Sequence, residues 1–405
     1  MMGYWTEALA FALRWLHVVA AIAWIGESFY FVALDRGLAK PKSKAPGLFG
    51  ESWSVHGGGF YLKQKFMPAP AELPDDLHWS KWKSYTTWMS GFALLCLVYL
   101  TAPNLYLVDP KVLALSNSEA VLAALLLLLG SWLIYDLACK VFAHNEQALS
   151  VAVLLFVLGL CLASTHVFSG RAAFLLTGAA LATCMSANVF FVIIPGQKRL
   201  VQALAQGGAI NPEDGLRGKQ RSVHNTYFTL PVVFTMLSSH WGPAYADAHR
   251  GWLLFVIVLG AAMIREFFVR WHSGQRTWPL LASGFALMLA VVWYLAPRPV
   301  VPAPAAPNTA SSEPGTAAIA ATNSPPTLAE LEPVFQKHCR NCHSSAPTIM
   351  PVAPKGMVLD TPEQWQAQRA LIRQQVVVAR IMPLGNLTQI SEAERELIQR
   401  WADAP

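Results

Sequence analysis

Long apolar runs alternate with short polar segments over roughly the first three quarters of the chain. A membrane-spanning helix needs about 20 consecutive apolar residues, because each residue adds about 1.5 Å across a hydrocarbon core about 30 Å thick. By this criterion the sequence predicts eight transmembrane helices, at about residues 8–34, 84–103, 120–143, 148–167, 172–195, 225–242, 251–271 and 278–296. The first run is not expected to be a signal peptide, because it lacks a basic start and continues past any small-residue cleavage site. The pattern predicts an all-α, polytopic membrane bundle over residues 1–296.

The pattern changes after residue 296. Residues 297–326 are rich in Pro, Ala, Ser and Thr and poor in charge, a composition typical of semi-extended linkers. Residues 327–405 contain two short helical patterns, and their first residues, Thr327 and Ser391, are each followed three positions later by Glu. This spacing is the capping-box signature of a helix start. We therefore expect a membrane domain, a linker and a small α-helical domain.

Composition supports this prediction. Hydrophobic residues make up 54% of the 405-residue chain and charged residues only 13%, whereas soluble domains are about one quarter charged. The formal net charge of +6 is modest, and the basic residues concentrate in alternate loops. This distribution indicates membrane topology, with no nucleic-acid partner.

The loops that carry the basic residues predict the orientation. The loops after the first, fifth and seventh predicted helices hold Arg36, Lys40, Lys42, Lys44, Lys63, Lys65, Lys81, Lys83, Lys198, Arg199, Arg217, Lys219, Arg221, Arg270 and Arg276. The alternate loops hold only Lys111, Arg171 and Arg250. Because Lys and Arg favour cytoplasmic loops, both termini are expected outside.

The small domain carries Cys339-Arg340-Asn341-Cys342-His343, the spacing that attaches a c-type haem. The two thiols form thioethers to the haem, and the histidine ligates the iron. A Cys-x-x-Cys pair alone also suits zinc or a redox dithiol, but this domain has no second Cys pair. The motif therefore favours one covalent haem c. The other four cysteines lie in apolar segments, where a small buried thiol is the ordinary interpretation.

A methionine is expected as the sixth iron ligand, which raises the reduction potential. Met382 is preferred because Pro383 ends the preceding helix and leaves the side chain in a loop. Met350 and Met357 are the alternatives. The arrangement resembles a small mono-haem cytochrome c, which packs its first and last helices together.

Three histidines are expected in the outer half of the bundle: His17, His166 and His240. Neutral imidazoles on facing helices can hold a non-covalent, b-type haem or another redox centre. The alternative is that each forms ordinary hydrogen bonds between helices or at the interface. The sequence leaves both interpretations open.

The long loop before the second helix contains His56 followed by three glycines. Such a run lets a backbone approach a ligand or a helix closely, but the Lys-Ser/Thr ending of a phosphate-binding loop is absent. The following segment, "LPDDLHWSKWKSY", is interpreted as an interfacial anchor with Trp and Lys at the headgroups.

Several segments resemble one family. The stretches "RWLHVVAAIAWIGESFYFVALD", "VHGGGFY", "LHWSKWKSY", "FSGRAAFLLTGAALATCMSANVFFVIIPGQ" and the terminal "CRNCH" are similar to the membrane-bound urate hydroxylases, or PuuD-type urate oxidases, of bacterial purine breakdown. The resemblance covers the whole chain. It implies oxidation of urate to 5-hydroxyisourate, with electrons leaving through the attached cytochrome c to a respiratory acceptor such as a cytochrome c or a terminal oxidase. It also implies the bacterial inner membrane, with the cytochrome c domain in the periplasm.

Urate is a planar anion, so its oxidation needs a positive, partly desolvated pocket and a group that accepts protons. Candidate anion-binding residues are Arg14, Arg171 and Arg265, and candidate proton acceptors are Glu27, Asp136 and His17. The alternative for Arg14 and Arg265 is pairing with Glu27, Asp136 or Glu266 to hold helices together.

Other functions suit the same features. One is a membrane cytochrome c reductase that acts on a quinol or a porphyrinogen, and another is a non-enzymatic electron relay that anchors a cytochrome c. A third is a transporter with a redox-sensing tail. A relay needs only one anchoring helix, so eight helices with ionisable residues favour the enzyme.

Overall fold

The computed structural model describes residues 2–296, 325–349, 353–354 and 357–404. Nearly all of the expected linker, 297–324, lies outside these residues, and so does Met350. The chain forms two compact units, residues 1–291 and 292–405. The first is the membrane unit, and the second carries the haem motif.

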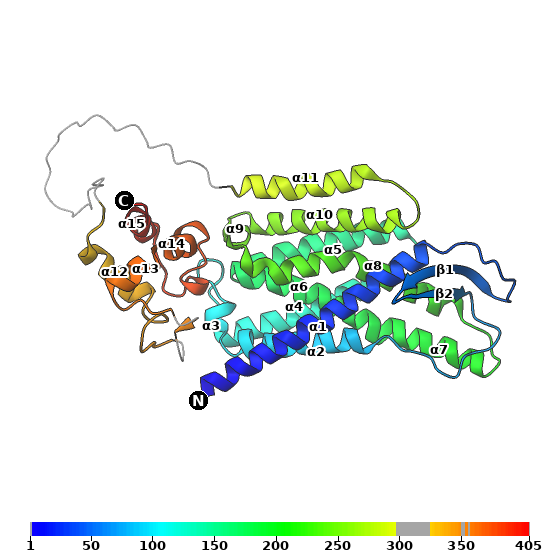
Figure 1. The fold of residues 1–405 in the computed structure, drawn as a ribbon. Coiled ribbons are helices and arrows are strands. Elements are labelled where there is room, and N and C mark those ends of the chain that lie inside the picture. Colours follow the sequence, from blue (N-terminus) through cyan, green and yellow to red (C-terminus); the bar gives the residue numbers. More distant parts are fainter. Residues whose placement is uncertain (1, 297–324, 350–352, 355–356, 405) are drawn as a thin grey trace. The chain divides into compact units, whose positions relative to one another are not determined.

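The membrane unit is built mainly of long helices (Figure 1). Its helical elements are α1 (Met2–Arg36), α2 (Trp82–Leu94) with the π-helical η1 (Leu95–Leu100), α3 (Pro103–Tyr106), α4 (Asn117–Val141), α5 (Glu146–Val167), α6 (Gly170–Ala187) with the π-helical η2 (Asn188–Ile193) and α7 (Ile194–Ala205), α8 (Pro212–Leu237) with η3 (Ser238–His240), α9 (Gly242–Ala246), α10 (Arg250–Trp271) and α11 (Trp278–Tyr294). Each of the eight apolar runs of the sequence is therefore mainly helical.

Five helical segments in the described part of the chain are long and apolar enough to cross a membrane: Trp5–Arg36, Asn117–Val141, Glu146–Val167, Gly170–Ala205 and Arg250–Trp271. Helix α11 is apolar but has only 17 residues. Helix α8 does not qualify because its first half is polar. The structure supports a multi-pass membrane protein, and the number of eight spans stays a prediction.

Helix α6 lies in the middle of the bundle and packs on α4, α5 and α8. Its small residues allow this close packing. Gly178 is in contact with α8, because a Cβ there would lie 2.8 Å from the Cβ of Thr235. Helix α1 packs mainly along α2.

A β-hairpin corrects the all-α prediction. Strand β1 (Leu48–His56) pairs antiparallel with β2 (Gly59–Phe66). Gly57 and Gly58 form the two-residue turn with positive φ values of 57° and 81°, a conformation that glycine adopts without strain. The glycine run therefore makes a turn, and within the described structure no other part of the chain approaches it: a Cβ added at these glycines would meet nothing within 4 Å.

The C-terminal unit is a small helical domain. Its elements are α12 (Leu328–His338), α13 (Pro362–Ala367), α14 (Arg369–Ile372) with η5 (Arg373–Val378), η6 (Leu384–Asn386) and α15 (Glu392–Asp403). Both predicted capping boxes, at Thr327 and Ser391, are confirmed. The first and last helices meet through Phe335 and Trp401, whose rings lie 5.7 Å apart at 85°, and Phe335 also stacks on Trp365 at 4.0 Å.

Candidate functional site

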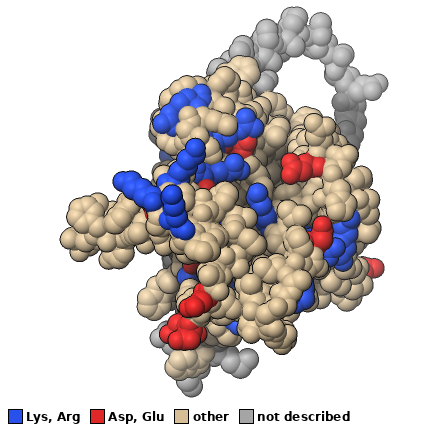
Figure 2. Space-filling model, turned by 90° about the vertical axis from the view of Figure 1, so that its right-hand side faces the viewer, with Lys and Arg blue, Asp and Glu red and all other residues tan. Residues whose placement is uncertain are grey.

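A pocket of about 510 Å³ lies where the end of α4, η2, α7 and the start of α8 meet. This is the end of the membrane unit that carries the hairpin, and Figure 2 shows Lys and Arg side chains predominating on it. The lining residues are Trp132, Asp136, Cys139, Lys140, Ala143, Phe191, Val192, Arg199, Asp214, Arg217, Gln220 and Arg221. Of these, only Asp136 was a predicted site residue.

Two aromatic rings form part of the pocket wall. Trp132 of α4 and Phe191 of η2 lie 5.9 Å apart at an interplanar angle of 24°, which is close to stacked. The Arg221 guanidinium lies over the rings of Trp132 and Tyr135, at 5.9 and 5.1 Å. Aromatic faces and a guanidinium together suit a flat, electron-rich ligand.

The Asp136 carboxylate in the pocket forms ion pairs with two cationic side chains. Arg221 Nη2 donates to Asp136 Oδ1 at 2.7 Å, and Lys140 Nζ lies 2.6 Å from Asp136 Oδ2. The Arg221 side chain is only 4% exposed and that of Asp136 15%, whereas Lys140 is 70% exposed. The three groups together carry one surplus positive charge.

A buried polar network holds Arg221 from behind. The Asn188 amide donates to the Tyr135 hydroxyl at 3.1 Å and to Asn225 Oδ1 at 2.8 Å, and Tyr135 also bonds His224 Nδ1 at 2.8 Å. Arg221 Nη1 lies 3.4 Å from Asn188 Oδ1. Asn188 begins the π-helical turn η2, and such turns inside helices are frequent at functional sites. The network fixes the guanidinium in one position on the wall.

Arg221 is the main pocket residue whose position was predicted wrongly from the sequence. It was counted among the basic residues of an inner loop, but α8 begins at Pro212, so Arg221 lies inside a helix and is 3% exposed. Asp136 lies about one and a half turns from the end of α4. It could have indicated a buried cationic partner such as Arg221, because a carboxylate at this depth needs a cation.

The remaining predicted carboxylate has a structural partner. Glu27 of α1 accepts a hydrogen bond from Lys83 Nζ of α2 at 2.7 Å and another from Ser80. This ion pair joins α1 to α2, and Arg14 is exposed on the other half of α1. The alternative in which Arg14 pairs with Glu27 finds no support in these contacts.

Arg265 of α10 is buried without a carboxylate. It is 3% exposed, its guanidinium lies 3.9 Å from the centre of the Phe29 ring, and its Nε and Nη2 have no partner within the described structure. The neighbouring Glu266 is bonded to Arg270 and Tyr227 instead. The alternative in which Arg265 pairs with Glu266 finds no support in these contacts.

Arg171 lies near the start of α6, beside the phenol of Tyr99. Its Nε is buried and has no hydrogen-bond partner among the described residues. Arg171 does not line the pocket around Arg221.

The three candidate haem histidines each have separate surroundings. His17 Nδ1 lies 3.0 Å from the Thr87 carbonyl and 3.2 Å from Ser90 Oγ, both on α2. His166 is exposed and bonds the Leu162 carbonyl of its own helix, and His240 is exposed in η3. Among the described residues, no group of three His, Cys, Asp or Glu side chains is arranged to hold a metal ion. The membrane haem stays a prediction without support from these contacts.

The haem motif lies at the end of α12 in the C-terminal unit. Cys339 is 9% exposed and belongs to the core with Phe335 and Trp365. His343 Nδ1 donates to the Met357 carbonyl at 3.2 Å. A carbonyl only accepts, so Nδ1 carries the proton and Nε2 keeps a free lone pair. These residues fit a covalent haem, because a ligating histidine usually has its other nitrogen held in this way.

The two methionine candidates among the described residues differ in the hydrogen bonds that their backbone carbonyls accept. Both Met357 and Met382 pack against the core. The Met357 carbonyl accepts from Nδ1 of His343, so Nε2 of His343 would be the atom that binds a haem iron. The Met382 carbonyl instead accepts from Arg395 Nη1 at 3.1 Å, and Arg395 is 6% exposed. Met382 stays the predicted sixth ligand, and Met357 is the alternative among the described residues.

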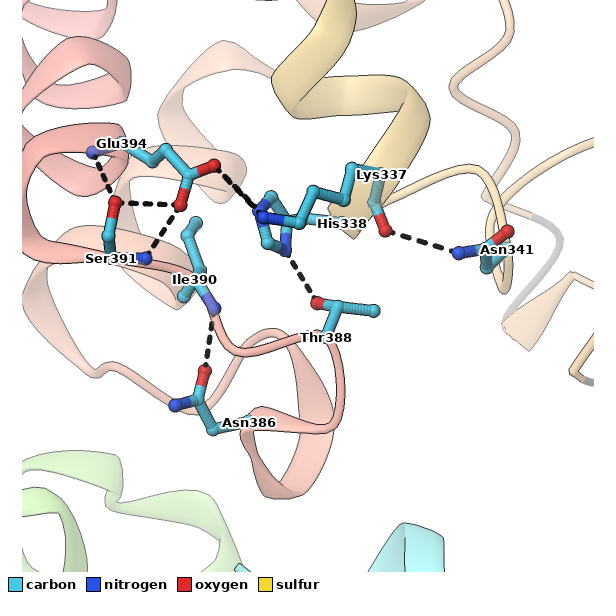
Figure 3. A network of polar contacts seen from close by, with 8 residues as sticks. All are labelled: Lys337, His338, Asn341, Asn386, Thr388, Ile390, Ser391 and Glu394. Carbon is cyan, nitrogen blue, oxygen red and sulfur yellow. Dashed lines mark hydrogen bonds and ion pairs between the residues drawn. The ribbon is translucent and has the colours of Figure 1, made fainter. Parts of the chain in front are cut away.

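A polar network next to the motif joins both ends of the domain (Figure 3). His338, the last residue of α12, bonds Thr388 Oγ1 at 2.6 Å through Nδ1 and Glu394 Oε1 at 3.1 Å through Nε2. A carboxylate only accepts, so Nε2 donates and Nδ1 accepts from the hydroxyl. Glu394 also caps α15 through Ser391. His338 therefore fixes the loop that follows Met382 against the helix that carries Cys339.

This network predicts an acid-labile C-terminal unit. Burial lowers the pKa of His338 from its ordinary value of 6.5. Burial alone would raise the pKa of Glu394, but hydrogen bonds from Ser391 and His338 lower it to about 2. In both cases the unfolded chain binds more protons than the folded one, so stability should fall as the pH drops from about 6.5 towards 2. Calorimetry of the full-length protein should show this transition at lower temperatures in acid. Glu394→Gln should flatten the loss below about pH 4.5, and an unchanged slope there would contradict the role of Glu394.

The comparisons with known proteins match the membrane unit. The family model described as "Urate oxidase N-terminal" matches residues 3–296, which include the pocket and every helix of that unit. No curated protein and no solved structure matches the chain. Because the match covers well over half of the 405 residues, the chain belongs to the urate oxidase N-terminal family.

Proposed function

We propose that the protein oxidises urate to 5-hydroxyisourate in its membrane unit and passes the electrons to a c-type haem in its C-terminal unit. The family match over residues 3–296 is the observation that carries the substrate. The motif Cys339 to His343 supports the electron outlet, because it lies outside the matched residues and provides a one-electron carrier.

The reaction balances without oxygen as a reactant. Urate and one water give 5-hydroxyisourate, two protons and two electrons. A covalently bound haem accepts one electron at a time, so it is emptied twice in each turnover. The chain's own residues bind the anion, exclude bulk water and accept protons, for which Asp136 on the pocket wall is a carboxylate within reach of solvent.

The setting follows from the same proposal. The Lys- and Arg-rich end faces the cytoplasm of a bacterial inner membrane, and the C-terminal unit lies in the periplasm. With eight membrane spans, the chain leaves the membrane after α11 on the periplasmic side. The final acceptor is a respiratory component such as a cytochrome c or a terminal oxidase. A second, b-type haem at His17, His166 and His240 is part of the proposal only if a pyridine haemochrome spectrum shows b-type absorbance.

The test is reduction of the haem by urate. When urate is added anaerobically to the purified full-length protein, the c-type absorbance should change from the oxidised to the reduced form. Xanthine, which lacks the oxygen at C8, is the matched control and should leave the spectrum unchanged. If a quinol reduces the haem and urate does not, the protein is instead a cytochrome c reductase for another donor.

Met382 should be the sixth iron ligand. Replacing it with Leu, which keeps the volume, should abolish the Met–iron charge-transfer band and lower the haem reduction potential, because a thioether ligand raises that potential. Met357→Leu is the matched control, since Met357 packs against the same core. Loss of the band in Met357→Leu but not in Met382→Leu would exchange the two assignments.

A further inference from the structure

We propose that the pocket around Arg221 is the substrate site, where Arg221 binds the oxygen edge of a planar purine anion and Trp132 and Phe191 lie against its ring. This assignment rests on the proposed oxidation of urate, because that reaction supplies the ligand. Nothing in the family match assigns a residue of the pocket, and four of the five candidate residues from the sequence lie elsewhere in the membrane unit.

The size and the walls of the pocket suit such a ligand. Small-molecule sites have volumes of about 300–1,000 Å³ with aromatic walls and a few fixed polar groups. This pocket has about 510 Å³, and its aromatic residues come from two different elements, α4 and η2. Because the Trp132 and Phe191 rings are already 5.9 Å apart and nearly parallel, a purine lies on their outer faces and not between them.

The net positive charge of the pocket favours an anionic ligand over a neutral one. Four cations line it, Lys140, Arg199, Arg217 and Arg221, against two carboxylates, Asp136 and Asp214. Asp214 forms an ion pair with Arg199, with Nε–Oδ2 at 3.0 Å, and Asp136 forms ion pairs with both Arg221 and Lys140. The four positive and two negative charges leave a surplus of two, so a bound anion offsets a repulsion that is present without it.

Arg221 is the anchor because it is already fixed. Its contacts with Asp136 and Asn188 and the two aromatic rings below it hold the guanidinium in one orientation. A positioned arginine loses little side-chain entropy on binding, so more of the interaction appears as affinity. Lys140, Arg199 and Arg217 are more than half exposed and act mainly by attracting the anion to the pocket mouth.

Arg265 is the strongest rival. It is as buried as Arg221 and has two unpartnered nitrogens, Nε and Nη2, on the same edge of the guanidinium. These nitrogens are enclosed by packed atoms, and Arg265 does not line the pocket described above. A ligand there would require α1 to separate from α10, whereas the Arg221 pocket is already open.

The experiment measures urate binding separately from oxidation. Equilibrium dialysis of labelled urate against the oxygen-free, haem-reduced full-length protein should show Arg221→Lys binding about 10- to 100-fold more weakly than the unmodified protein, because lysine keeps the charge but loses the planar fork. Phe191→Leu should weaken binding about 3- to 10-fold. Phe191 is 61% exposed, so this second variant tests the pocket even where Arg221→Lys does not fold.

Two further variants make the result decisive. Arg270→Lys, an exposed residue at the same end of the bundle, should bind urate normally. If Arg265→Lys weakens binding while Arg221→Lys and Phe191→Leu do not, the site lies between α1 and α10 and the inference is overturned. If the unmodified protein binds and oxidises urate and both pocket variants bind equally well, the inference fails and the proposed function stands. If the unmodified protein neither binds urate nor is reduced by it, the proposed function fails and the inference fails with it.

Discussion

Replacing Cys339 and Cys342 together with alanine should abolish covalent haem attachment and reduce urate oxidation to background. The two thioethers are the only covalent bonds expected between the porphyrin and this chain, and without them His343 and Met382 would hold the iron only by reversible bonds. The reaction loses two electrons from urate, so removing the proposed outlet stops turnover even when the membrane unit is intact. Haem staining of the denatured protein on a gel measures attachment, and urate consumption measures turnover.

The controls for this pair of substitutions are already in the chain. Cys96 is a free, partly exposed cysteine of η1 in the membrane unit, and Cys96→Ala should change neither the haem stain nor the activity. The isosteric pair Cys339→Ser and Cys342→Ser distinguishes loss of the thioethers from loss of volume beside Phe335. If the double alanine variant loses its haem and still oxidises urate at the original rate, the C-terminal haem is not the electron outlet.

The helices could be predicted because their signals are local. Apolar runs of about 20 residues report burial in lipid whatever the neighbouring helices do. Thr327 with Glu330, and Ser391 with Glu394, satisfy backbone groups within a single turn, so the sequence alone located both helix starts. The hairpin also has a local signal, Gly57-Gly58 between Val55 and Phe60, although this segment is predicted from the sequence to lie in a long loop.

The pocket could not be predicted, because its groups meet only through tertiary packing. Trp132 and Asp136 belong to α4, Phe191 to a π-helical turn and Arg221 to α8. Periodicity fixes which side of one helix is polar but not which helix faces it. The same limit explains the histidines. Topology placed His17 and His166 at similar depths, but depth does not determine direction, and His17 faces α2 while His166 is exposed.

The Asp136–Arg221 ion pair on the pocket wall should contribute more to stability than any other ion pair that lines the pocket. Asp136→Asn leaves the Arg221 guanidinium buried with no carboxylate, and breaking a buried pair in this way costs about 3–5 kcal/mol. We therefore expect the free energy of unfolding of the membrane unit to fall by about 3 kcal/mol, since Asp136 retains some contact with solvent. Thermal unfolding in detergent micelles, followed by the loss of helical circular dichroism, measures this change.

Asp214→Asn is the matched control. Asp214 pairs with Arg199 on the same pocket, but Arg199 is 59% exposed, so this pair should contribute less than about 1 kcal/mol. A double variant, Asp136→Asn with Arg221→Gln, removes both buried charges and should recover part of the stability lost in Asp136→Asn, while urate binding stays weak because the guanidinium is gone. Equal losses for Asp136→Asn and Asp214→Asn would contradict the buried pair. Recovery of stability without recovery of binding would instead separate the two roles of Arg221, which holds α8 to α4 through Asp136 and offers its charge to the ligand.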